Sequence, residues 1–189
     1  MLKVRGIHHI SSIVGHAQRN LDFYASVLGM RLVKQTINFD DSSTYHLYYG
    51  NEDASTPVIT TFPWNDAKEG HSGSGYVEVT TFGVNENTLD FWEDRLTSFN
   101  VDVFRYTRFN IERLAFKDPD GLNLEIIETD KGDNNTWEFN HVDETHALKG
   151  IDSAILASRV PDTTLNLLTD ILGFKIVDED EEHYLLQAD

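Results

Sequence analysis

The chain has 189 residues, 40% of them hydrophobic, and a formal net charge of −17 from 15 lysines and arginines against 32 aspartates and glutamates. This length allows one large or two small domains, and the acidic balance argues against nucleic acid or an anionic membrane as a partner, because both need concentrated positive charge. The absence of cysteine excludes disulfides, thiolate nucleophiles and cysteine-bound metals, so a metal site would have to use histidine and carboxylate.

No apolar run in the chain approaches the ~20 residues that span a membrane. Residues 1–5 are not followed by the apolar core of a signal peptide. We therefore expect a cytoplasmic protein with no membrane partner. The net charge does not exclude a small neutral or cationic ligand.

Residues 6–13 read Gly-Ile-His-His-Ile-Ser-Ser-Ile, an apolar strand signal that carries two adjacent histidines. Because successive side chains of a strand point to opposite faces, His9 and Ser11 share one face, and His8 shares the other with Ile10. One imidazole is therefore expected to face inward, where an unpartnered ring nitrogen would cost about 1–3 kcal/mol. The pattern leaves two explanations for this position, a hydrogen-bonded core histidine or a metal ligand.

Three segments of the chain share a helical spacing of apolar residues: 21–28, 89–96 and 165–172. In the first and third segments a glycine, Gly29 or Gly173, follows as a helix C-cap would require. Each predicted helix also follows a strand-like run that begins with a glycine, and these runs start at residues 6, 75 and 150. The chain is therefore built from a repeated unit that begins strand–helix–strand.

Further strands are expected after each helix, at 30–37, 43–50 and 57–63, at 101–106, 111–116 and 122–128, and at 183–187. The turn Asp-Pro-Asp-Gly at 118–121 suits a tight connection between antiparallel strands. The unit is therefore βαβββ and the fold class α+β. One face of each sheet should lie on the helices, and the other should line a concave, partly polar surface.

We expect an N-terminal domain over residues 1–130, made of units at about 1–66 and 74–130. The acidic stretch 131–147 is interpreted as a linker. Residues 148–189 are interpreted as the start of a second, incomplete domain. An incomplete sheet leaves an unpaired edge that another copy of the chain could cover, so a homo-oligomer is one alternative.

The repeated unit, the Leu-Gly-Met end of the first helix at 28–30, and the turn at 118–121 followed by Glu125 resemble the vicinal oxygen chelate superfamily. This superfamily contains glyoxalases, bleomycin resistance proteins and extradiol dioxygenases. Four segments, at 6–10, 32–41, 44–50 and 62–64, are similar to those of ring-cleaving dioxygenases that act on hydroquinone-type substrates. The resemblance covers essentially the whole chain.

This resemblance implies a protein of four units with Fe(II) held by two histidines and one glutamate, one histidine being on the first strand and the other two ligands in the fourth unit. The ligand position falls on His9, and the positions that support it fall on His8 and Ser11. The implied partners are a small aromatic substrate and dioxygen, with Mn(II), Ni(II) or Zn(II) as alternative metals. Such a ligand set leaves adjacent open positions for a phenolic oxygen and dioxygen. The 189 residues contain three units, so the other two ligands are not located.

Two alternatives remain. Glu125 occupies a position where many members of the superfamily carry a metal carboxylate, and Glu78 aligns with His9 in the second unit. A site of His9, Glu78 and Glu125 would suit a metal-dependent lyase or isomerase of glyoxalase type, although Glu125 also suits a structural hydrogen-bonding role. The other alternative is a non-catalytic protein that holds an aromatic ligand. His46, in an aromatic strand, is expected to be a packed sheet residue.

Overall fold

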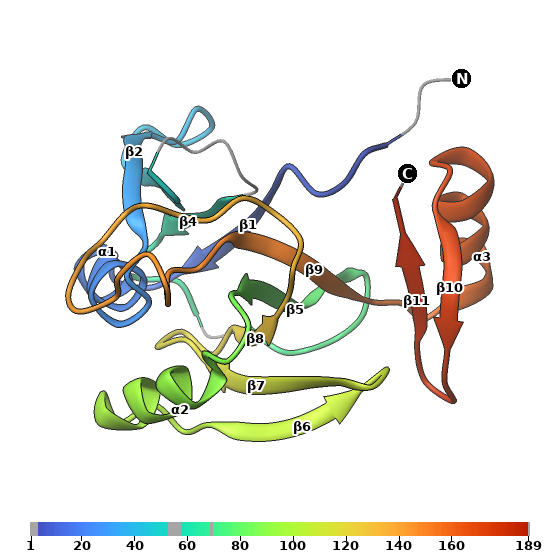
Figure 1. Cartoon of the computed structure of the whole chain (residues 1–189). Helices are drawn as coiled ribbons and strands as arrows, with labels where there is room; N and C mark the ends of the chain where they lie inside the picture. The colour runs from blue at the N-terminus through green and yellow to red at the C-terminus, as the bar shows by residue number, and fades with distance from the viewer. Residues whose placement is uncertain (1–3, 53–57, 69, 189) are drawn as a thin grey trace.

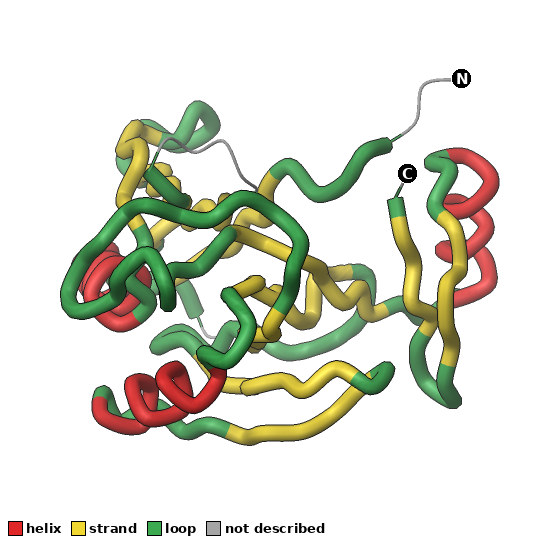
Figure 2. The backbone as a smooth tube through the Cα atoms, viewed as in Figure 1, coloured by secondary structure: helices red, strands yellow, loops and turns green. Residues whose placement is uncertain are grey.

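The computed structural model describes residues 4–52, 58–68 and 70–188 and shows an α+β fold (Figure 1). The strand–helix–strand pattern occurs three times along the chain, as the repeats predict (Figure 2). Among these residues, no helix is long and apolar enough to cross a membrane.

The first unit forms a four-stranded sheet in the order β1-β4-β3-β2. Its elements are β1 (His9–Val14), α1 (Ala17–Leu21), the π-helix η1 (Asp22–Val27) that continues α1, β2 (Arg31–Ile37), β3 (Tyr45–Gly50) and β4 (Val58–Pro63). Strand β1 pairs with β4 in parallel, and the other pairs are antiparallel. The predicted strands are confirmed, and residue 57, where the third was expected to begin, lies outside the described residues.

Helix η1 covers one face of this first sheet. It does so because its apolar residues recur at helical spacing and are buried, and the ring of Tyr24 stacks on that of Tyr49 at 4.9 Å. Asn20 accepts hydrogen bonds from the hydroxyls of Tyr49 (2.9 Å) and Thr61 (2.8 Å). The helix ends where Gly29 takes a φ of +69°, which confirms the predicted C-cap.

The second unit forms a five-stranded sheet in the order β6-β7-β8-β5-β9, in which β9 comes from the third unit. Its own elements are β5 (Tyr76–Val84), α2 (Leu89–Ser98), β6 (Phe104–Arg108), β7 (Ile111–Lys117) and β8 (Asn123–Glu128). Strand β6 lies two to three residues later than predicted. The reason is its turn, where Phe109 and Asn110 have positive φ and pair Arg108 with Ile111.

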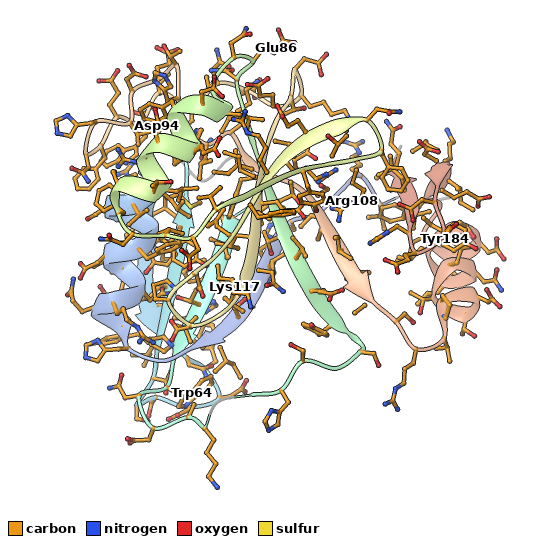
Figure 3. All side chains as sticks on the ribbon, turned by 90° about the horizontal axis from the view of Figure 1, so that it is seen from below. Trp64, Glu86, Asp94, Arg108, Lys117 and Tyr184 are labelled. Atoms are coloured by element: carbon orange, nitrogen blue, oxygen red, sulfur yellow. The ribbon has the colours of Figure 1, made fainter. Side chains whose placement is uncertain are left out.

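The third unit contributes one strand to the second sheet and extends away from it. Its elements are β9 (Gly150–Ala157), α3 (Pro161–Asn166), the π-helix η2 (Leu167–Ile171), β10 (Lys175–Glu179) and β11 (Tyr184–Gln187). Strand β9 pairs antiparallel with β5, and β10 and β11 form a separate two-stranded sheet beside α3 (Figure 1). Several large apolar side chains of this unit are exposed, including Ile171, Ile176 and Tyr184 (Tyr184 is labelled in Figure 3).

The segment from 131 to 147 packs on the first two units, although it has no helix or strand of its own. It passes across α1 in Figure 1, and Val142 and Ala147 are buried in the same core cluster as Tyr24 and Trp92. The indole nitrogen of Trp92 donates to the carbonyl of His146 at 3.0 Å. This segment therefore contributes to the shared core of the first two units.

Candidate functional site

The two histidines lie at the start of β1, with their rings in contact. Their Nδ1 atoms are 2.9 Å apart, so one ring donates a hydrogen bond to the other, and the rings meet edge to face at 5.1 Å. Residue 8 precedes the strand, which is why the alternation of an ideal strand does not separate the two rings. The pairing occupies Nδ1 of His9 and leaves its Nε2 free of this hydrogen bond.

Both imidazoles are exposed, so the prediction that one of them faces inward is wrong. The residues of β1 that point inward are Ile10 and Val14, which are 8% and 2% exposed. In the described residues, the opposite face of the first sheet carries no helix, and His9 lies on that side. The ring nitrogens can therefore be hydrated, and the cost of an unpartnered buried nitrogen does not arise.

Ser11 lies two residues after His9, on the same open face of the first sheet. Its hydroxyl and that of Thr60 on the neighbouring strand β4 are 2.8 Å apart. Thr60 is fully buried, so this hydrogen bond holds the Ser11 side chain across the β1–β4 pair. The predicted polar character of this face is thus observed beside His9.

The described residues bring together no group of three or more histidine, aspartate or glutamate side chains that could hold a metal ion. Glu78 lines a cavity of about 370 Å³ between β1 and β5 that Ser11 also lines. Glu125 does not line that cavity. It borders a separate cavity of about 940 Å³, between η1 and the ends of β7 and β8, which His9 does not line.

Glu125 is instead the centre of a buried network on the second sheet. Its carboxylate accepts hydrogen bonds from Arg113 (2.8 Å), Arg108 (3.0 Å) and the Thr81 hydroxyl (3.0 Å), and also from the Tyr106 hydroxyl. Arg108 is labelled in Figure 3. Two guanidinium groups on one carboxylate leave no free oxygen position for a cation. This arrangement matches the structural hydrogen-bonding role and not the metal role.

The network also sets the protonation of its members. Burial by itself raises the pKa of the Glu125 carboxyl, but the hydrogen bond from Tyr106 and the charges of Arg108 and Arg113 outweigh it and hold that pKa below its ordinary value. Burial, reinforced by the hydrogen bond to Glu125, raises the pKa of Tyr106 to about 12. The carboxylate therefore stays ionised and the phenol neutral at neutral pH.

Sequence reasoning placed His46 in the sheet as a packed residue and missed its polar partner. The His46 ring is stacked on Phe62 at 4.0 Å, as packing predicts, but its Nδ1 also lies 2.8 Å from the Tyr48 hydroxyl. Burial, and then the charges of His9 and Lys34, lower the pKa of His46. The i,i+2 spacing of a histidine and a tyrosine on one strand face could have indicated this pair.

Comparisons with a protein-family model and with individual known proteins point to the same superfamily. The family described as "Glyoxalase/Bleomycin resistance protein/Dioxygenase superfamily" matches residues 6–126. The chain is 51% identical over 176 residues to "Putative ring-cleaving dioxygenase MhqO" of Bacillus subtilis (strain 168), covering 93% of this chain and 56% of that protein. It is 36% identical over 157 residues to "Chlorohydroquinone/hydroquinone 1,2-dioxygenase" of Sphingobium indicum, covering 80% of this chain and 49% of that protein.

A solved structure shows the same fold over nearly the whole chain. It is described as a putative dioxygenase from Bacillus subtilis subsp. subtilis str. 168, with a TM-score of 0.96 and 48% identity, covering 98% of this chain and 60% of that one. The chain thus spans roughly half to three fifths of the length of these relatives.

Proposed function

The chain belongs to the glyoxalase/bleomycin resistance protein/dioxygenase superfamily, and from this premise we propose that it acts in the ring cleavage of hydroquinone-type aromatics, with dioxygen as co-substrate and Fe(II) as the metal. The observation that carries the proposal is the histidine pair at the start of β1, where His8 engages Nδ1 of His9 and leaves Nε2 available. A ligating histidine characteristically uses one ring nitrogen for the metal and the other for a hydrogen bond that orients the ring.

The described residues do not form a complete iron site, because no three of their metal-binding side chains converge. His9 is therefore proposed as this chain's contribution to a site whose other ligands come from another segment or another molecule. The bound metal would supply dioxygen activation. The chain's own residues would orient the ligand through His8 and present the hydroxyls of Ser11 and Thr60 beside it.

The proposal is tested on a fusion of this chain to the part of the Bacillus subtilis relative that it does not match. After anaerobic loading with Fe(II), the fusion should retain about one iron per chain and consume oxygen on addition of methylhydroquinone. His9→Ala should lose both, because one protein ligand of the iron is removed. Iron is measured by elemental analysis after desalting, and oxygen by an electrode.

The matched control is His71→Ala, which removes an exposed loop imidazole and should change neither reading. Iron content and oxygen uptake that survive in His9→Ala would overturn the proposal. Loss of both in His71→Ala as well would show that the effect is not specific to the histidine pair.

A further inference from the structure

The buried network around Glu125 contains more positive than negative charge. Arg108 and Arg113 both form ion pairs with the Glu125 carboxylate, at 3.0 and 2.8 Å, and the three side chains are 14%, 5% and 3% exposed. Glu125 is ionised at neutral pH, because its pKa lies below the ordinary value despite burial. Two guanidinium groups against one carboxylate leave one positive charge, and a buried charge is costly unless a counter-ion neutralises it.

The arginine on the other face of the same strand shows no such imbalance. Arg105 of β6 has carboxylate oxygens of Asp90 at 2.7 Å and of Glu93 at 3.1 Å. Because side chains alternate along a strand, Arg105 and Arg108 lie on opposite faces of the sheet. The whole chain has a formal net charge of −17, so the excess of positive charge around Glu125 is a local feature and not a consequence of composition.

The two arginines of the network also have hydrogen-bond donors to spare. Arg108 donates to Glu125 through Nη2, which leaves Nε and Nη1 of its guanidinium group without a hydrogen bond to any described residue. Nε of Arg113 is buried and likewise has no hydrogen-bond partner in the part of the chain that the structure describes. A guanidinium group presents its donors in a planar fork that matches the two oxygens of a carboxylate. The spare donors and the excess charge therefore both favour a bound carboxylate.

Aromatic rings lie beside these guanidinium groups. Phe104, Tyr106 and Arg108 are spaced two residues apart along β6 and therefore share a face. The Phe104 and Tyr106 rings stack at 5.8 Å and 21°, and the guanidinium carbon of Arg108 lies 5.7 Å from the centre of the Tyr106 ring. The Phe104 ring is 68% exposed. An aromatic ring can lie against Phe104 and Tyr106 while a carboxylate attached to it reaches Arg108.

A space of ligand size adjoins this face of the second sheet. Phe104 is paired with Ala115, and Ala115 with Glu125, so these three residues form a row across β6, β7 and β8. All three border the cavity of about 940 Å³. Small-molecule sites have volumes of about 300–1,000 Å³, so one aromatic ring with a substituent can be accommodated.

We propose that the second sheet binds a small aromatic carboxylate, whose carboxylate group is held by Arg108 and Arg113 and whose ring lies against Phe104 and Tyr106. Glu125 is a positioning residue, which holds the two guanidinium groups and does not contact the ligand. The inference goes beyond the proposed function and does not depend on it, because none of these residues lies on β1.

The test is NMR titration of the 189-residue chain with benzoate, benzamide and acetate, followed through the backbone amide signals of Tyr106 and Arg108. Benzoate should bind more tightly than benzamide, which lacks the charge, and than acetate, which lacks the ring. Arg108→Met should weaken benzoate binding about tenfold or more, because charged hydrogen bonds are lost. This variant should fold, since Arg113 still neutralises Glu125, and circular dichroism checks that it does. Phe104→Ala, at an exposed position, should weaken benzoate and leave acetate unchanged.

The matched control is Arg105→Met, which removes a guanidinium group from the opposite face of the same strand and should leave the affinity for benzoate unchanged. An unchanged affinity for benzoate in folded Arg108→Met would overturn the inference, as would equal affinities of the unsubstituted chain for benzoate and benzamide. An equal fall in both arginine variants would indicate a general effect of charge and would also overturn it.

Discussion

Replacing Glu125 by leucine is expected to lower the free energy of unfolding by about 3–5 kcal/mol. The substitution leaves the guanidinium groups of Arg108 and Arg113 buried without their counter-charge, and removing one partner of a buried ion pair costs far more than the pair contributes. Urea unfolding followed by circular dichroism measures the change. The control is Asp90→Asn, which breaks an ion pair to Arg105 at a side chain that is 90% exposed and should have little effect.

The same network makes the stability of the protein sensitive to acid. The folded-state pKa of Glu125 lies below its ordinary value, so its contribution is present above the unfolded-state pKa and is lost as the pH falls through the folded-state pKa. The free energy of unfolding of the Glu125→Leu variant should therefore fall less steeply with decreasing pH, below about pH 4.5, than that of the unsubstituted chain. Equal slopes would contradict the lowered pKa.

Glu125→Leu also separates the structural role from a metal role. The iron content of the Glu125→Leu fusion protein is measured under conditions in which the variant is folded, far below its unfolding midpoint. Unchanged iron content would agree with a carboxylate whose role is to bind the two arginines. Specific loss of iron in a variant that remains folded would instead restore Glu125 as a ligand, alongside His9 and Glu78.

Replacing Gly29 by alanine is expected to destabilise the chain by about 2–5 kcal/mol. Its φ of +69° is unfavourable for a residue with a Cβ by about 1–2 kcal/mol. A Cβ added there would also lie 2.8 Å from the Cβ of Val142, and overpacking of this kind costs about 1–3 kcal/mol. Thermal or urea unfolding measures the sum.

A double-mutant cycle isolates the contact with the 131–147 segment. In a Val142→Gly background, Gly29→Ala should cost only the backbone part, about 1–2 kcal/mol. Gly73→Ala serves as the control, because no atom lies within 4 Å of the Cβ it would add. An undiminished cost of Gly29→Ala in the Val142→Gly background would mean that the contact with Val142 contributes nothing to that cost.

The order of elements follows from the sequence alone. Helical spacing, a capping glycine such as Gly29, and the Asp-Pro-Asp-Gly turn are local signals, because each depends on residues within a few positions of one another. These signals predict the positions of the helices and strands in all three units. The exception is β6, which lies later in the chain than predicted because its turn has positive φ at Phe109 and Asn110. The residues that resemble the ring-cleaving dioxygenases also identified the family before any contact was known.

Tertiary structure alone decided which of these residues meet. The sequence could not show that β9 pairs with β5 or that Glu125 is held by Arg108 and Arg113. It also placed one imidazole of the histidine pair inward, whereas both are exposed on the open face. Strand pairing and ion pairing join residues that lie far apart in the chain or on different strands, and the pattern along a single strand does not determine which face is covered.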